Sequence, residues 1–297
     1  MYNIYNYRDS NIRATRILFV AFFGLVIAIG WFLSRLYNEP SILIVAVFFS
    51  SFMSLLSYWF SDKIVLSMSR AIPVSMENAP ELYRVVENLA ITAGLPAPKI
   101  YLIPEKAPNA FATGRDPEHA VIAVTEGLLE KLDRTELEGV VSHELSHVGN
   151  RDILIGTVAI VLVGFISIAA DIFLRSSFFG RRSDRGNGGS GVFALIGLVF
   201  VLLAPIVATL LRLAVSRNRE FLADSSGALL TRYPEGLAAA LEKISSDQTP
   251  MRMANNSTAH LWIDNPFRGK QKKSLLNRMF MTHPPVEERI KRLRELE

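Results

Sequence analysis

The segment "VVSHELSHVGNRD", residues 140–152, places two histidines four positions apart with a glutamate between them. Residues four apart on an α-helix lie on one face a single turn apart, so His143 and His147 are expected to direct ring nitrogens at one point. Zinc binds an imidazole nitrogen at about 2.0–2.1 Å. Glu144 is rotated away from that point but within reach of a water bound there, which is the arrangement of the H-E-x-x-H motif. The segment therefore predicts metal-assisted hydrolysis with Glu144 as the general base.

An alternative is that the two histidines lie on the solvated face of an amphipathic helix. The residues beside them favour a packed helix instead, because four are aliphatic: Val140, Val141, Leu145 and Val148. A helix with this composition is expected to bury one side against the rest of the protein.

Four long apolar runs occur in the chain, which has 297 residues, half of them apolar. The only charged residue in the runs is Asp171. The hydrocarbon core of a bilayer is about 30 Å thick, which about 20 helical residues span. We therefore expect four transmembrane helices, at residues 17–34, 41–60, 153–174 and 192–211. Two alternatives remain open: buried helices of a soluble core, and, for the second pair, a hairpin that does not fully cross the bilayer.

The first run is expected to remain attached as an anchor, because a second span follows at once and no small-residue cleavage site separates them. The runs divide the chain into four parts. Residues 1–60 are the N-terminal segment with two transmembrane helices, and 61–152 are the first part of a polar domain that includes the histidine helix. Residues 153–211 are a hydrophobic hairpin with a loop at 175–191, and 212–297 are the second part of the polar domain.

The polar domain is predicted to be α+β. Three β-forming segments, at 99–103, 109–114 and 119–125, predict a small antiparallel sheet. Thr135 and Glu138 form a capping-box pattern at the start of the histidine helix, and Gly149 with Asn150 ends it. Other helical patterns occupy residues 77–96, 214–230, 234–247 and 284–296.

The distribution of arginine and lysine predicts the orientation in the membrane. Arg8, Arg13 and Arg16 precede the first run, whereas only Arg35 lies in the link to the second. Basic residues in short loops favour the cytoplasm, so the polar domain is expected there. The arginine-rich loop 175–191 disagrees, because it would lie on the opposite side.

A catalytic zinc site needs a third protein ligand and an open position for water. The best candidate is Glu220 in "SRNREFLAD", residues 216–224, about 14 Å along a helix beyond the fourth run. Two crossings return the chain to its starting surface, so Glu220 is expected to meet His143 and His147 there. Asp224, one turn further on, is expected to accept the spare N–H of a liganding histidine. The alternative for Glu220 is an ion pair with Arg217 or Arg219.

"HELSHVGNRD", the two apolar runs after it, "SRNREFLAD" and "THPPVEERIKRL" (282–293) together resemble the HtpX-type membrane metalloproteases, relatives of the CAAX prenyl proteases within the gluzincin-like zinc peptidases. The resemblance covers nearly the whole chain. It implies a four-span protein in the plasma membrane of a prokaryote, with a cytoplasmic endopeptidase domain that acts in membrane-protein quality control. It also implies one zinc ion per chain, with His143, His147 and Glu220 as ligands and Glu144 as general base.

Three further residues are candidates for substrate handling. A substrate chain is commonly held by strand addition to a sheet edge, for which "NAFATG" (109–114) is the expected edge. Asn109 is a candidate to fix a substrate carbonyl, although a turn or capping role is equally consistent with the sequence. His283 is a candidate to stabilise the oxyanion or to cap a turn. Arg217 has the same status.

Two other functions remain as alternatives. A CAAX-type processing enzyme would share the metal site but act on prenylated proteins, and it would not digest unmodified protein. A non-catalytic membrane scaffold or transporter would use a structural zinc, but such sites usually include cysteine, and the chain has none. The expected partners are polypeptides and the lipid bilayer. Nucleic acid is not expected, because the net charge is only +4 and no basic patch is interleaved with aromatics.

Overall fold

The structure is a computed structural model that describes residues 4–159, 161, 217–253, 258–259, 261–267 and 284–296. Only the first residues of the expected third span, up to residue 161, are described. The rest of that span, the loop 175–191, the expected fourth span at 192–211 and His283 lie outside the described residues. Four transmembrane helices are therefore not confirmed.

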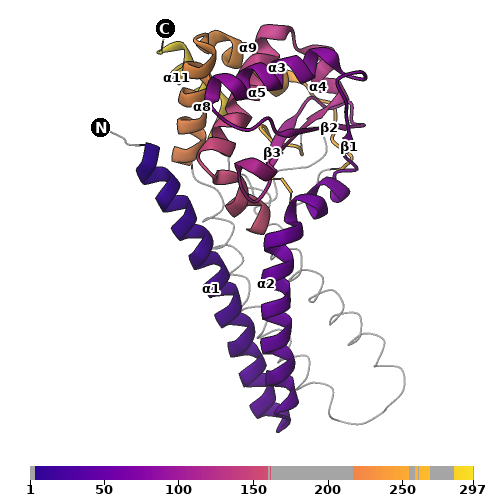
Figure 1. The fold of residues 1–297 in the computed structure, drawn as a ribbon, viewed down its shortest axis with the longest axis vertical. Helices are drawn as coiled ribbons and strands as arrows, with labels where there is room; N and C mark the ends of the chain where they lie inside the picture. Colours follow the sequence, from indigo (N-terminus) through magenta and orange to yellow (C-terminus); the bar gives the residue numbers. More distant parts are fainter. Residues whose placement is uncertain are drawn as a thin grey trace.

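The first two apolar runs form two long helices that extend from the rest of the protein as a hairpin (Figure 1). Helix α1 spans Ile4–Tyr37 and helix α2 spans Ser41–Met68. Both are long and apolar enough to cross a membrane, and only 17% and 11% of their most apolar windows are buried. A core helix of a soluble protein would be mostly buried. Here large side chains such as Val20 and Phe48 are more than 70% exposed, which suits contact with lipid.

The polar domain contains a mixed four-stranded sheet, so the predicted antiparallel sheet is wrong. Its strands are β1 (Ile72–Pro73), β2 (Lys99–Ile103), β3 (Ala110–Thr113) and β4 (Val121–Thr125), in the order β1-β2-β4-β3. Strands β2 and β4 are parallel, and the other neighbours are antiparallel. After β2 the chain continues to the far edge to form β3 and then returns between the two. Three of the four strand segments were predicted, but β1 was not, and neither was the order in which the strands are neighbours.

Helix α5 (Arg134–Gly149), which carries both histidines, lies in the middle of the domain (Figure 1). Its aliphatic residues Val140, Val141, Leu145 and Val148 are all buried in the main core, as the sequence predicted. The helices around α5 occupy the predicted segments: α3 (Pro80–Ala93), α8 (Arg217–Thr231), α9 (Pro234–Ser246) and α11 (Val286–Arg294). Two short helices, η1 (Pro117–His119) and α4 (Glu126–Lys131), flank β4.

Helix α5 is capped two residues earlier than predicted, and its capping box uses different residues. Asp133 is the N-cap and accepts from the Glu136 N–H at 3.0 Å, while the Glu136 carboxylate accepts from the Asp133 N–H at 2.9 Å. The predicted pair has other partners: Thr135 donates to Asp133, and Glu138 accepts from Arg134. An aspartate two residues earlier supplies the same geometry, so the helix starts there.

Two glycines let neighbouring helices approach α5 closely. A Cβ on Gly139 would lie 2.5 Å from the backbone nitrogen of Leu237 in α9, and a Cβ on Gly227 of α8 would lie 3.0 Å from the backbone nitrogen of His143. The close approach at Gly227 brings the helix that carries Glu220 against the helix that carries both histidines.

We expect Gly139→Ala to lower the free energy of unfolding by about 1–3 kcal/mol, because the added methyl group overlaps backbone atoms that cannot rotate away. Gly149→Ala is the control on the same helix, since its Cβ would meet only a leucine methyl group at 3.6 Å. Thermal unfolding of the detergent-solubilised protein measures both. Equal melting temperatures for the two variants would contradict the close-approach argument.

Candidate metal centre

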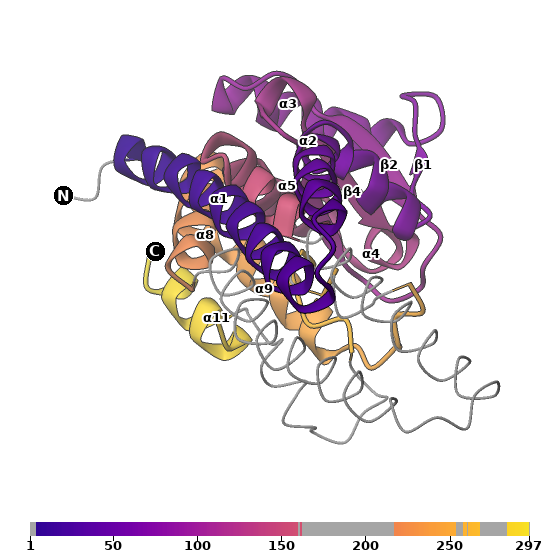
Figure 2. The same ribbon diagram turned by 90° about the horizontal axis from the view of Figure 1, so that it is seen from below.

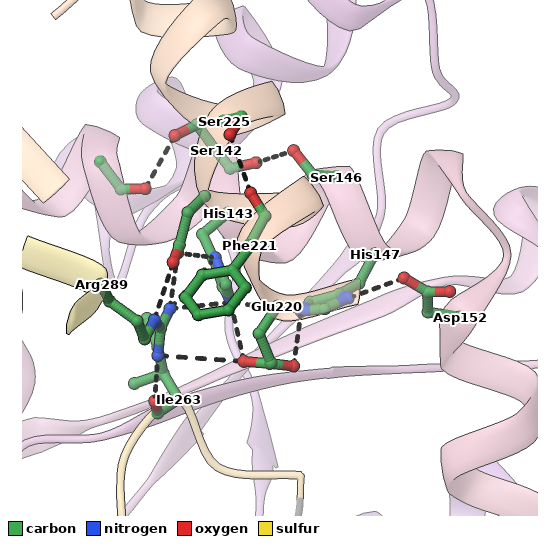
Figure 3. Close-up of polar contacts among 12 residues, drawn as sticks. Ser142, His143, Ser146, His147, Asp152, Glu220, Phe221, Ser225, Ile263 and Arg289 are labelled. Atoms are coloured by element: carbon green, nitrogen blue, oxygen red, sulfur yellow. Dashed lines mark hydrogen bonds and ion pairs between the residues drawn. The ribbon is translucent and has the colours of Figure 1, made fainter. Parts of the chain in front are cut away.

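The structure brings the three predicted ligand residues into one cluster (Figure 3). The Nε2 atoms of His143 and His147 are 3.2 Å apart. Glu220 Oε1 lies 3.6 Å from His147 Nε2, and Glu220 Oε2 lies 3.9 Å from His143 Nε2. All three side chains are largely buried, and His147 is the most exposed of them at 16%.

These separations are close to those expected for a metal ion bound by all three side chains, with Glu220 slightly too far from His143. Ligand atoms about 2.0–2.2 Å from a tetrahedral zinc ion lie about 3.3–3.6 Å from each other. Two imidazole nitrogens and one carboxylate oxygen form a ligand set that zinc accepts, and three protein ligands leave the fourth position open. Among the described residues, no other group of three histidine, cysteine, aspartate or glutamate side chains is close enough to hold an ion.

The buried ion pair of Asp224 and Arg289 contacts the Nδ1 side of the His143 ring, away from the other ligands. Asp224 Oδ1 lies 2.9 Å from His143 Nδ1, which is the contact expected from the sequence. Arg289 donates to the same carboxylate twice, from Nη2 at 2.7 Å and from Nε at 2.9 Å. It also donates from Nη1 to the backbone oxygen of Ile263 at 2.9 Å. The bidentate arginine fixes the carboxylate, and the carboxylate orients the ring.

Asp152 plays the equivalent part for His147. Its Oδ2 atom lies 3.0 Å from His147 Nδ1, on the side of the ring away from the cluster. Each histidine therefore directs Nε2 toward the cluster and Nδ1 toward a carboxylate. This arrangement selects the tautomer that leaves Nε2 free to bind a metal ion.

Sequence analysis did not identify Asp152 or Arg289. Asp152 stands in the quoted segment, five residues after His147. Arg289 is three residues after Val286 and four before Leu293 in α11, so it occupies the buried face of an amphipathic helix. An arginine at a core position was the available signal that a buried acid lies opposite.

Burial dominates the electrostatics of His143. It lowers the pKa of His143 to about 4, although the hydrogen bond with Asp224 acts in the opposite direction. Burial alone would raise the pKa of Asp224, but the charge and hydrogen bonds of Arg289 and the contact with His143 lower it to about 2. At neutral pH this part of the site therefore contains a neutral imidazole backed by an ionised carboxylate.

The pKa values of His147 and Glu144 are raised, whereas those of His143 and Asp224 are lowered. Burial alone would lower the pKa of His147, but the hydrogen bond that it donates to Asp152 and the charges of Glu220, Asp152 and Glu144 raise it to about 9. Burial raises the pKa of Glu144 to about 7, even though the charge of His147 and a backbone hydrogen bond with Ala112 oppose this. A carboxyl group with a pKa near 7 suits a group that accepts and returns a proton at neutral pH.

The remaining candidates are placed differently. Asn109 is buried and links β3 to the segment 258–267, because its side chain donates to Asp264 O at 3.0 Å and accepts from Asp264 N–H at 3.3 Å. This favours the turn role over contact with a substrate. Arg217 is exposed at the start of α8, whereas the neighbouring Arg219 is buried. His283 lies outside the described residues.

A family model and several relatives from other organisms match this chain over most of its length. The model of Peptidase family M48 matches residues 76–297. A protein named Protease HtpX homolog from Thermoanaerobacter pseudethanolicus is 44% identical over 299 residues, covering 99% of this chain and 98% of its own length. Proteins of the same name from Syntrophobacter fumaroxidans and Pyrococcus furiosus are 49% and 48% identical. These two matches each cover 95% of this chain, and 98% and 94% of the relatives. Among solved structures, S. mikatae Ste24p is similar over 97% of this chain and 66% of its own, with 19% identity and a TM-score of 0.49.

We expect zinc affinity to rise with pH between 7 and 9. In this range His147 of the metal-free protein loses the proton that zinc must displace, since its pKa is about 9. The displacement of one proton makes the apparent affinity rise about tenfold per pH unit well below this pKa, and about 50-fold over the range. His143 adds no dependence here, because a pKa of about 4 leaves it neutral throughout. Competition with a chelator of known pH dependence gives the affinity, and a flat profile would contradict the assignment.

Replacement of Arg289 by methionine is expected to lower the free energy of unfolding by about 3–5 kcal/mol, because it leaves the carboxylate of Asp224 buried without a cation. Lys291→Met is the control on the same helix, where the lysine is exposed and pairs with Glu295 at the surface. Denaturant unfolding in detergent measures both variants. Equal losses would show that the buried pair has no special weight.

Proposed function

Because this chain belongs to Peptidase family M48, it is a metalloprotease, and we propose that it is a zinc-dependent endopeptidase of the cell membrane that cleaves misfolded or damaged membrane proteins at the cytoplasmic face. The observation that carries the proposal is the cluster of two imidazole nitrogens and a carboxylate, 3.2–3.9 Å apart. Glu144 lies beside it, on the helix that carries both histidines.

Zinc in this cluster would lower the pKa of a water molecule to about 7 and polarise the peptide carbonyl group. His143, His147 and Glu220 would hold the ion, and Asp224 and Asp152 would keep the two rings aimed at it. Glu144 would take the proton from the water and pass it to the leaving amine. Without the ion, burial raises the pKa of Glu144 to about 7, within the range that suits a general base at neutral pH.

The edge strand of the sheet supports cleavage of an extended polypeptide. Strand β3 has β4 on one side only, and its other edge lies beside α5. One outward carbonyl of this edge, that of Ala110, already accepts from the Ile263 N–H at 3.0 Å. A substrate strand would pair with the remaining part of the edge, toward Thr113, and this would place its backbone next to Glu144.

The position of the site relative to the candidate membrane spans supports membrane proteins as substrates. The α1–α2 hairpin extends from one side of the polar domain, and in projection from below α1 crosses α8 and α9 (Figures 1 and 2). The basic residues before the first span, Arg13 and Arg16 among them, support a cytoplasmic location for this domain. Cytoplasmic segments of damaged membrane proteins would then meet the site close to the bilayer.

Replacement of Glu144 by glutamine tests the mechanism. We expect the variant to retain zinc, because Glu144 is not a ligand, and to lose cleavage of unmodified casein by about 10²–10⁴-fold in kcat. Glu138→Gln is the matched control on the same helix, where the glutamate pairs with Arg134 at the surface. Turnover by Glu144→Gln equal to that of the control would count against a general base at this position. Failure of the wild-type protein to digest unmodified casein would favour the CAAX-type alternative.

A further inference from the structure

We propose that Asn11, on the first candidate membrane helix, is a positioning residue of the metal centre. Its side-chain amide joins the residue that orients His147 to the helix that carries Glu220. The inference deepens the proposed function, on which it rests, by giving α1 a part in the metal site in addition to anchoring.

Asn11 is 4% exposed and lies on α1, six residues before the apolar run that begins at Ile17. A polar amide buried at such a position is costly unless all its hydrogen-bonding groups have partners. The structure supplies them from two distant parts of the chain. The Asn11 Nδ2 group donates to Asp152 Oδ1 and, at 3.0 Å, to the backbone oxygen of Asn150. The Asn11 Oδ1 atom accepts from Arg219 Nη1 at 3.1 Å.

The partners of Asn11 are the neighbours of two metal-ligand residues. Asp152 uses its other oxygen, Oδ2, for His147 Nδ1 at 3.0 Å. Arg219 precedes Glu220 in α8. The amide therefore closes a chain of contacts that runs from His147 through Asp152, Asn11 and Arg219 to the backbone of Glu220. This chain fixes two ligands from different segments relative to each other, which matters because a metal site tolerates little displacement of its ligands.

Asparagine fits this position because it offers both a donor and an acceptor. The Asp152 carboxylate can only accept hydrogen bonds, and the Arg219 guanidinium can only donate them. Aspartate at position 11 would keep the contact with Arg219 but would direct a second carboxylate at Asp152. Alanine would leave both charged side chains without this partner.

The packing of α1 holds Asn11 in place. About two and three turns further on, Leu18 and Phe22 are buried against Val158 and Ala159, in the helical segment that begins at Asp152. Thr15 is equally buried on this face, but its hydroxyl donates only to the Asn11 carbonyl of its own helix, at 2.9 Å. Thr15 therefore provides a control for packing without the cross-link.

The test measures metal retention in the full-length, detergent-solubilised protein. The rate of zinc transfer to an excess of chelator and the visible spectrum of the cobalt-substituted protein are recorded for wild type, Asn11→Asp, Asn11→Ala and Thr15→Val. We expect zinc loss about tenfold faster for both Asn11 variants, with a changed cobalt spectrum. We expect wild-type values for Thr15→Val. Normal retention in both Asn11 variants, or equal losses in all three variants, would overturn the proposal.

A donor–acceptor exchange separates positioning from a general loss of folding. In the double variant Asn11→Asp with Asp152→Asn, the amide at position 152 would donate to position 11 and accept from His147, and Arg219 would keep its acceptor. We expect the double variant to retain zinc better than Asn11→Asp alone, including the case in which the single variant fails to fold. Absence of rescue would overturn the inference. Wild-type protein that holds no metal would overturn the proposed function as well, whereas metal-loaded wild type with unaffected Asn11 variants would overturn only this inference.

Discussion

The structure depends on the contact between α5 and α8. This contact places the buried carboxylates of α8 next to the groups that compensate their charge, without which burial would be unfavourable. Glu220 and Asp224 are both less than a tenth exposed and stand one turn apart on α8, and His143 faces them from α5. Two buried carboxylates on one helix face repel each other unless cations compensate them. Arg289 compensates Asp224 with two hydrogen bonds and lies 3.9 Å from Glu220. The close approach at Gly227 makes this arrangement possible.

The proton and the metal ion do related electrostatic work in this site. Without the ion, the acids around His147 raise its pKa to about 9, so a proton on the ring supplies positive charge between Glu220 and Asp152. A divalent ion would displace that proton and supply more charge at the same place. The cluster can therefore remain assembled before the ion binds, and the ion binds ligands that are already close to their final separations. Such preorganisation reduces the conformational entropy that metal binding must overcome.

Sequence reasoning succeeded where a local pattern sets the geometry. The spacing of His143 and His147 fixes them on one helix face, and the apolar residues beside them predicted a packed helix, as observed. It failed where the answer depends on which segments become neighbours. The parallel pairing of β2 with β4 follows from the path of the chain, not from the residues of either strand. Arg289 could not be paired with Asp224, 65 residues away, from helical periodicity alone. The capping box was displaced for a simpler reason, since two overlapping patterns were present and Asp133 supplied the cap.

The metal centre takes residues from almost the full length of the chain. The three ligands and Glu144 lie on α5 and α8. The residues that hold them in position are Asp152, which follows α5, Arg289 of α11 and Asn11 of α1. Contacts between such distant residues form only after the loops between them have closed, and this closure has an entropic cost that local contacts avoid. A fragment that lacks α1 or α11 would contain the H-E-x-x-H helix and the two carboxylates that orient its rings, but not Asn11 or Arg289, which bond those carboxylates. Complete assembly of the site therefore involves both the first candidate membrane helix and the C-terminal helix.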